Sequence, residues 1–218
     1  MPLLHPVSTT EALVGALRER VLAGELAPGD PLPEQRVAEE FGVARPTVRA
    51  AVQALAFEGL LRREPNRSAH VPRLTEEDVR DLFLVRTSLE LHAVTTLIER
   101  GVRPLAAERA LERLEAREEE ELSWTEVVDA ALGFHRGLVE AVESPRLTRV
   151  FSSLEAELRL CFAQWKQTQG GLPADRTIEH RRILEAIVRR DAEQATQMMR
   201  EHLDRGGRLS RGPFSQHS

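Results

Sequence analysis

The chain has 218 residues with 41% hydrophobic content, which is enough for two domains, one small and one of moderate size. A single cysteine, Cys161, excludes an internal disulfide framework and predicts a reducing, cytoplasmic location, and we expect neither a signal peptide nor a membrane span. Because the formal net charge is -5, any contact with nucleic acid has to come from a local basic patch rather than from bulk charge.

The first predicted helix begins with a capping box. Ser8-Thr9-Thr10-Glu11 places a hydroxyl and a carboxylate at the two positions of that motif, and Leu13, Leu17 and Val21 follow at helical spacing up to Gly24. We expect this helix to pack across the next two helices and to close a three-helix core.

Two short helices joined by a tight turn are predicted between Leu32 and Leu61. The first runs from Glu34 to Phe41, and Gly42 begins the turn, because it can adopt the left-handed backbone of a sharp helix exit. One face of the second helix is apolar at i, i+3, i+4 and i+7, which predicts burial of four residues: Val48, Ala51, Val52 and Leu55.

The opposite face of the second helix carries Arg45, Arg49 and Gln53, one helical turn apart. Arginine pairs with guanine edges or phosphates and glutamine can read adenine, so this face has the chemistry needed to enter a DNA major groove. The arrangement is that of a helix-turn-helix. The pattern leaves one alternative open, an ordinary helical hairpin with a solvated basic face.

The segments around this helix pair favour a winged helix. Upstream, residues 26–33 form a Pro/Gly connector that sets the entry angle. Downstream, residues 59–63 lead through residues 65–68 into Ala69-His70-Val71, which we interpret as two short strands about a turn. This hairpin looks like a wing with three arginines: Arg62, Arg63 and Arg67.

Residues 25–71 resemble the winged-helix domain of GntR-family bacterial transcription regulators. Three motifs occur together and in order: the connector G-x-L-x-P-G-x-x-L, the helix R-x-T-V-R-x-A and the exit L-x-x-E-G-L. The resemblance implies these DNA-binding residues: Gln35, Arg45, Thr47, Arg49, Gln53 and Arg67. Ala44 replaces a capping Ser or Thr, Gln35 a common Arg and Ser68 a wing Gly. A lost cap costs about 1 kcal/mol, so these departures concern sequence preference rather than the DNA-binding role.

Beyond a short linker at residues 72–74 almost no strand pattern appears, and Thr75 to Asp78 caps a new helix. Six amphipathic segments follow: Glu76 to Arg100, Pro104 to Glu121, Thr125 to Val142, Arg146 to Gln169, Arg176 to Arg190, and Ala192 to Arg205. The expected fold is mainly α. It combines an N-terminal winged helix-turn-helix domain over residues 8–72, an all-helical bundle of about six helices over 73–206 and a disordered tail over 207–218.

Three histidines lie inside apolar stripes of their helices. His135 shares its face with Leu138 and Val139, His180 with Leu184, and His202 follows Met199 at helical spacing. All three are therefore expected in the bundle interior, where imidazoles without partners would cost several kcal/mol. Either each is hydrogen-bonded separately, or the three share a divalent ion such as Zn²⁺ or Ni²⁺.

A second resemblance concerns this bundle. The segments GFHRGLVEAVESPRL and EHRRILEAIVRRDAEQATQMMREHL resemble the all-helical ligand-binding domain, called FCD, of the FadR branch of the GntR family, so that the two resemblances together cover about residues 9–205. Members commonly bind a divalent metal through one Asp and three His and sense a small organic acid beside it. The resemblance implies that His135, His180 and His202 take the three His positions, whereas Ala131 stands at the Asp position.

Asp129 cannot simply replace the missing carboxylate. It lies six residues before His135, which is about 120° round the helix from the required face. Three neutral imidazoles can still form a facial site, with water or the effector's carboxylate in the open positions. We therefore expect a divalent metal site of the Zn or Ni type with reduced affinity.

Two arginines are candidates for effector binding. Arg86 lies near the middle of the first bundle helix with Glu90 four residues later, so a carboxylate clamp and a plain helical salt bridge both fit. Arg159 has the same two interpretations.

The sequence predicts a homodimeric, sequence-specific DNA-binding regulator, most often a repressor in this family, whose helical domain binds a small carboxylate metabolite and mediates dimerisation. A metal-dependent enzyme of the bundle type and a helical protein-interaction module are the alternatives. We expect no enzyme, because the sequence has no Gly-rich phosphate loop, no Cys/His nucleophile arrangement and no paired-carboxylate motif.

Overall fold

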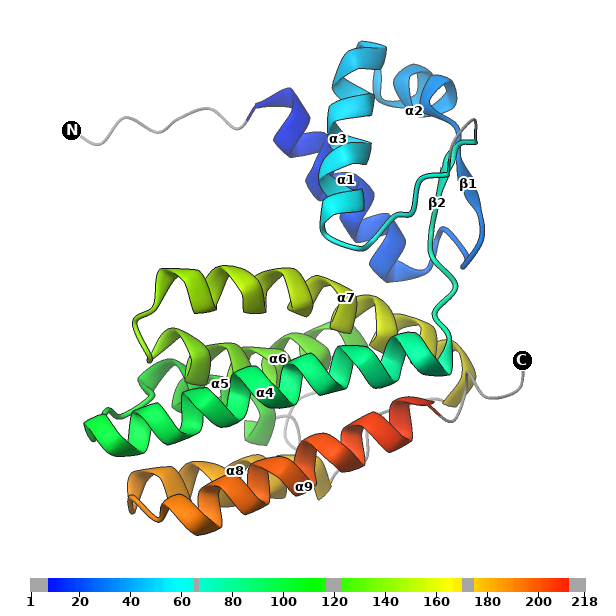
Figure 1. Cartoon of the computed structure of the whole chain (residues 1–218). Coiled ribbons are helices and arrows are strands. Elements are labelled where there is room, and N and C mark those ends of the chain that lie inside the picture. Colours follow the sequence, from blue (N-terminus) through cyan, green and yellow to red (C-terminus); the bar gives the residue numbers. More distant parts are fainter. Residues whose placement is uncertain (1–7, 65–66, 117–122, 170–174, 212–218) are drawn as a thin grey trace, which may run out of the picture.

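The structure, a computed structural model, describes residues 8–64, 67–116, 123–169 and 175–211. Its N-terminal domain contains α1 (Thr9–Ala23), β1 (Pro31–Leu32), α2 (Glu34–Phe41), α3 (Arg45–Phe57) and β2 (Ala69–His70). Its C-terminal domain contains α4 (Glu76–Arg100), α5 (Leu105–Glu115), α6 (Trp124–Glu140), α7 (Pro145–Gln169), α8 (Asp175–Val188) and α9 (Ala192–Arg211). Figure 1 shows the smaller N-terminal domain lying against one side of the helical bundle.

Local sequence determines where α1 and α2 begin and end. Ser8 and Glu11 form the predicted capping box at the start of α1, which ends at Gly24 with φ of 79°. Helix α2 ends at Gly42 with φ of 63°, which confirms the predicted left-handed helix exit. The apolar faces of α1 and α3 meet in the core of this domain, as predicted, through fully buried side chains: Leu13, Leu17, Val21, Val48, Ala51, Val52 and Leu55.

The wing differs in part from the prediction. Strand β2 is the predicted return strand, but the leading strand is reduced to a single bridge between Arg62 and His70. The main partner of β2 is β1, and the two strands pair antiparallel. The prediction for β1 was a connector without strand structure. Buried Leu32 and the hydrogen bond from the Val71 amide to the Asp30 carbonyl explain this pairing, because backbone groups near a core require partners.

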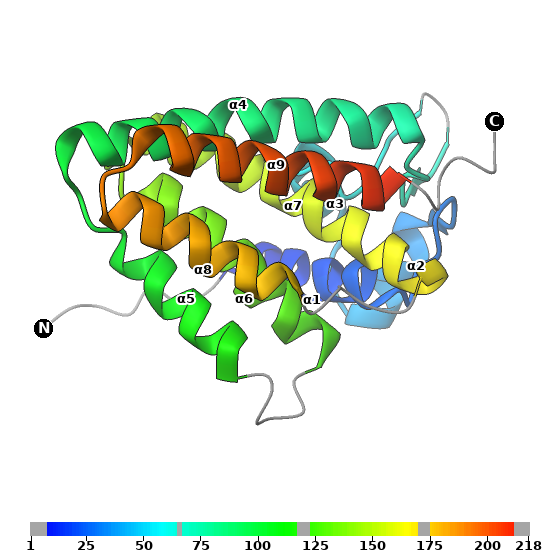
Figure 2. The ribbon, with the colours of Figure 1, turned by 90° about the horizontal axis from the view of Figure 1, so that it is seen from below.

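Six helices in the described residues form the predicted bundle. Figure 2 shows α8 and α9 side by side on the face remote from the N-terminal domain, and α4 packs along α9 while α5 packs along α6. The bounds of α4 are those predicted, and the starts of α6, α7 and α8 differ by one residue. Helix α5 ends at Glu115, and residues 117–121 of its predicted range lie outside the described residues. None of the described helices combines the length and apolar character of a membrane span.

The predicted disorder from residue 207 was wrong for the first five of those residues. Helix α9 continues through buried Gly206 and Gly207 to Arg211, and residues 212–218 lie outside the described residues. A Cβ at Gly207 would lie 3.2 Å from the Phe83 ring, so the small residues allow α9 to approach α4 closely. Tertiary packing here outweighs the low helix propensity of glycine.

A comparable close approach holds α5 against α6. A Cβ at Gly137 would lie within 2.8 Å of the backbone of Ala106 and Ala107, which cannot move aside as a side chain can. We expect Gly137→Ala to lower the free energy of unfolding by about 1–3 kcal/mol, measured by urea denaturation. The matched control is Gly133→Ala, one turn earlier, where the new Cβ would meet Ala110 at an ordinary 3.5 Å and raise stability by up to about 1 kcal/mol. Equal stability of the two variants would contradict this account.

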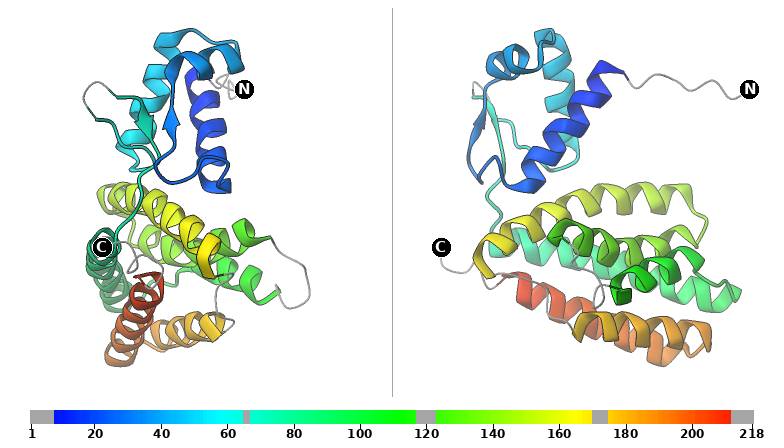
Figure 3. Two further views of the ribbon diagram at one scale, coloured as in Figure 1. Left: turned by 90° about the vertical axis from the view of Figure 1, so that its right-hand side faces the viewer. Right: turned by 180° about the vertical axis from the view of Figure 1, so that it is seen from behind.

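Helix α7 holds the linker between the domains. The Gln164 side chain donates to the Pro72 carbonyl at 2.8 Å and accepts from the Leu74 amide at 3.3 Å, and all of these groups are buried. An ion pair at 2.9 Å joins Arg62 of the N-terminal domain to Asp78 at the start of α4. Figure 3 shows α7 as the bundle helix beneath the N-terminal domain, so this helix couples the bundle to the linker.

Candidate metal centre and DNA-binding face

The three predicted histidines converge in the bundle interior. His135 comes from α6, His180 from α8 and His202 from α9, and each is only 2% exposed. The Nε2 atom of His135 lies 3.1 Å from that of His180 and 3.3 Å from that of His202. One ligand nitrogen of each ring falls within 4.8 Å of the others, which is the donor arrangement that a single metal ion could bridge.

Two carboxylates hold the outer nitrogens of this cluster. His135 Nδ1 lies 2.5 Å from Glu90 Oε2, and His202 Nδ1 lies 2.7 Å from Glu179 Oε2. An ionised carboxylate only accepts hydrogen bonds, so each Nδ1 carries the proton and each Nε2 keeps its lone pair toward the centre of the cluster. Carboxylates in this position orient histidine ligands and raise their basicity.

Glu90, like Glu179, is a functional residue that the sequence interpretation missed. It was interpreted only as the helical partner of Arg86, and the predicted salt bridge is present, with Arg86 Nε 2.7 Å from Glu90 Oε1. Both side chains are buried, at 2% and 0% exposed. Burial raises the pKa of Glu90, but the interactions with His135 and Arg86 outweigh it and hold that pKa below its usual range. The available sign was that Glu90 interrupts the apolar stripe of α4, which continues beyond it through Val94 and Leu97.

The described part of α6 adds no carboxylate to the three histidines, although the family's Asp ligand comes from this helix. Ala131 occupies the family position, and Asp129 forms an ion pair with Arg159, which also binds Glu155 at 2.7 Å. Arg159 lines a pocket at the domain junction. Of the two candidate effector arginines, Arg86 is therefore the one joined to the histidine cluster, through Glu90.

The predicted DNA-binding side of α3 faces solvent. Arg45, Arg49 and Gln53 are exposed, and Figure 1 shows the first turn of α3 on the side of its domain that faces away from the bundle. Neither arginine has an ion pair among the described residues, so both guanidiniums are available to a ligand. Ala44 makes no side-chain cap, as expected, and Thr47 is half-buried.

Two further predicted contacts lie outside α3. Gln35 is exposed on α2 and donates to Glu39 at 3.0 Å, and Arg67 is exposed on the wing and pairs with Glu64 at 2.8 Å. Both interactions are between solvent-exposed groups and cost little to exchange for DNA contacts.

Comparisons with known proteins agree with both parts of this structure. The family model for bacterial regulatory proteins of the gntR family matches residues 9–71, and that for the FCD domain matches residues 81–205. The HTH-type transcriptional regulator YdhC of Bacillus subtilis (strain 168) is 26% identical over 191 residues, which are 86% of this chain and 84% of that protein. The gluconate operon transcriptional repressor of the same organism is 28% identical over 158 residues, 70% of this chain and 63% of that protein.

A solved structure extends the likeness to the fold. The transcriptional regulator GntR from Rhodococcus sp. RHA1 has a TM-score of 0.77 at 27% identity, covering 93% of this chain and 97% of that chain. The FCD match alone spans more than half of the sequence, and these findings do not favour the enzyme or interaction-module alternatives. The chain therefore belongs to the gntR family of bacterial regulatory proteins, with an FCD domain, and is a DNA-binding transcription regulator.

Proposed function

We propose that this protein is a homodimeric repressor that binds a two-fold operator and responds to a small organic acid bound at a divalent metal ion. The observation that carries the proposal is the convergence of three buried imidazole Nε2 atoms, in an arrangement where carboxylates hold the outer nitrogens of two of the rings, His135 and His202. In this proposal residues 8–72 bind DNA, and residues 73–206 bind the effector and dimerise. A second recognition helix in the dimer supplies the other half-site, about one helical turn away.

The exposed face of α3 supports the operator contacts. We assign Arg45 and Arg49 to guanine edges or phosphates and Gln53 to adenine, because these pairings match the donor and acceptor geometry of the major groove. Thr47, Gln35 and Arg67 flank this face and would contact the backbone. Repression is supported by relatives named as repressors, those of the gluconate operon and of a D-xylose utilization operon of Paenarthrobacter nicotinovorans.

The donor set fits a divalent ion of the Zn or Ni type. Neutral imidazole suits both ions, and His135, His180 and His202 would occupy one side of the coordination sphere. No carboxylate comes from position 131, but Glu90 and Glu179 place negative charge directly behind two of the ligands. The open positions would accept water or the carboxylate of the effector.

Arg86 supports the choice of an acidic effector. Among the described residues its hydrogen bond to Glu90 uses only the Nε–H, so the two terminal amino groups remain as donors for a ligand carboxylate. A small acid could thus bind the metal at one end and the guanidinium at the other. The ion and Arg86 would select for negative charge, while the buried surroundings limit the size of the ligand.

A gel-shift assay tests the DNA-binding assignment. We expect specific retardation of the DNA upstream of the protein's own gene in the presence of competitor DNA, and Arg49→Ala should weaken it by about 1–3 kcal/mol. Arg189→Ala, an exposed arginine at the end of α8, is the matched control and should bind normally. Equal weakening by both variants would indicate a general charge effect and would contradict the assignment of α3.

A further inference from the structure

A pocket of about 460 Å³ lies where the N-terminal domain meets the bundle. It is formed by α1, the end of α3, α6 and α7, and its lining includes none of the three histidines. Leu22, Leu60 and Ala156 provide apolar walls, and Ser152 and Ser153 provide hydroxyl groups. The pocket therefore combines apolar walls with polar and charged side chains from two domains, and it is separate from the proposed metal centre.

Cations outnumber anions in this pocket. Its lining includes four guanidiniums, from α1, α6 and α7, and two carboxylates: Arg18, Arg136, Arg149, Arg159, Glu58 and Glu155. The Arg18 guanidinium donates two hydrogen bonds, of 2.9 and 2.7 Å, to the Glu58 carboxylate. Arg136 and Arg159 share Glu155, at 3.1 and 2.7 Å. Arg159 also pairs with Asp129 and Arg136 with Glu140, so the positive charge without an ion-pair partner in the described part of the chain is that of Arg149.

Two of these guanidiniums repel each other across the domain boundary. Burial lowers the pKa of Arg159, and the charge of Arg18 lowers it further. Arg18 belongs to α1 and Arg159 to α7, and the packing of the domains brings both side chains to the lining of one pocket. A negative ligand placed between them would relieve this repulsion, and the partly buried setting would strengthen its attraction to both.

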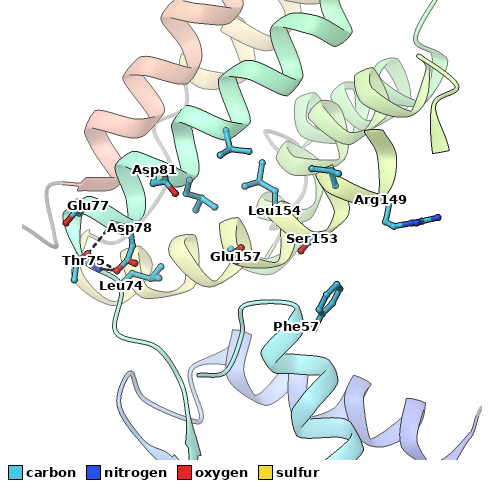
Figure 4. Close-up of a pocket in the computed structure, with 13 residues that line it drawn as sticks. Phe57, Leu74, Thr75, Glu77, Asp78, Asp81, Arg149, Ser153, Leu154 and Glu157 are labelled. Atoms are coloured by element: carbon cyan, nitrogen blue, oxygen red, sulfur yellow. Dashed lines mark hydrogen bonds between the residues drawn. The ribbon is translucent and has the colours of Figure 1, made fainter. Parts of the chain in front are cut away.

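The adjoining groove has the opposite character. It has a volume of about 740 Å³ and shares Phe57, Arg149 and Ser153 with the pocket. Figure 4 shows these three residues among those that line the groove. Its remaining polar lining is largely acidic and lies toward the start of α4: Glu77, Asp78, Asp81 and Glu157. An anion entering the junction is thus repelled from the groove and attracted to the pocket.

We propose that the pocket is a binding site for a compact multivalent anion, a phosphorylated or polycarboxylate metabolite. Its oxygens would pair with Arg149 and Arg159 of α7 and with Arg18 of α1, since guanidinium forks bind both kinds of oxyanion. An anion held in this way ties the DNA-binding domain to the bundle. The site does not depend on the metal centre and would act as a second input to the regulator.

Calorimetric titration of the full-length, metal-free protein tests this proposal. Inorganic pyrophosphate and citrate are titrated separately at constant ionic strength, with chloride as the background anion. We expect saturable binding of at least one of them, and Arg149→Gln should weaken it about tenfold. Two controls should bind as the wild type does: Arg146→Gln, an exposed arginine on the same helix outside the pocket, and His180→Ala in the histidine cluster.

The two probes also distinguish a phosphorylated ligand from a polycarboxylate ligand. Binding of pyrophosphate alone would support a phosphorylated ligand, and binding of citrate alone a polycarboxylate. Absence of saturable binding for both probes would overturn the proposal. So would unchanged affinity in both Arg149→Gln and Arg18→Gln, because the anion would then bind elsewhere. Loss of binding in His180→Ala would likewise overturn it, by placing the anion at the histidines.

Discussion

A Glu90→Leu variant is expected to lose about 3–5 kcal/mol of folding free energy. The substitution leaves the guanidinium of Arg86, only 2% exposed, without the carboxylate that now lies 2.7 Å away. It also removes the acceptor for His135 Nδ1. A buried charge without a partner has a large desolvation cost, and leucine cannot offset it. Urea denaturation followed by circular dichroism measures the loss.

Two further variants show whether burial causes this loss. Arg86→Met combined with Glu90→Leu removes both charges and should recover most of the stability, because no unpaired ion remains. Glu76→Leu breaks the other i, i+4 pair of α4, with Arg80 at 3.1 Å, where both side chains are exposed. That change should cost less than about 1 kcal/mol. A double variant no more stable than Glu90→Leu would contradict the argument.

The sequence predicted those features that depend on residues close together in the chain. Both ends of α4 are examples, because Thr75 and Asp78 cap its start and Gly101, with φ of 65°, ends it. The three histidines were placed in the interior for a similar reason. Each lies on the apolar face of its own helix, and that face has to be buried whichever helix it meets.

Contacts between segments that are far apart in the chain could not be predicted from the local sequence pattern. The pairing of Glu90 with His135 joins residues on α4 and α6. The sequence of one helix does not reveal which turn of another helix it will contact. The strand at Pro31–Leu32 exists only because β2 returns beside it. The last helix was predicted to end at Arg205, but α9 continues through Gly207, which is needed where that helix meets Phe83. In each case the deciding partner lies far away along the chain.

The wild-type protein is expected to bind one divalent ion per chain, and His180→Ala should weaken that binding by about a hundredfold or more, because one of three ligands is lost. Glu90→Gln should weaken it by about 10- to 100-fold without removing a ligand. The amide keeps the size of the carboxylate but loses the charge that orients His135 and raises its basicity. Competition titration against a chelating dye, with elemental analysis of the purified protein, measures both effects.

His92→Ala is the matched control, since His92 is exposed on the same helix as Glu90 and should not alter metal affinity. If His135→Ala and His180→Ala leave both metal content and thermal stability unchanged, the metal proposal is wrong. A loss of stability with no metal bound in the wild type would instead mean that the three imidazoles are satisfied separately by core hydrogen bonds. Glu90→Gln distinguishes these cases, because a purely structural carboxylate would change stability without changing the affinity for Zn²⁺ or Ni²⁺.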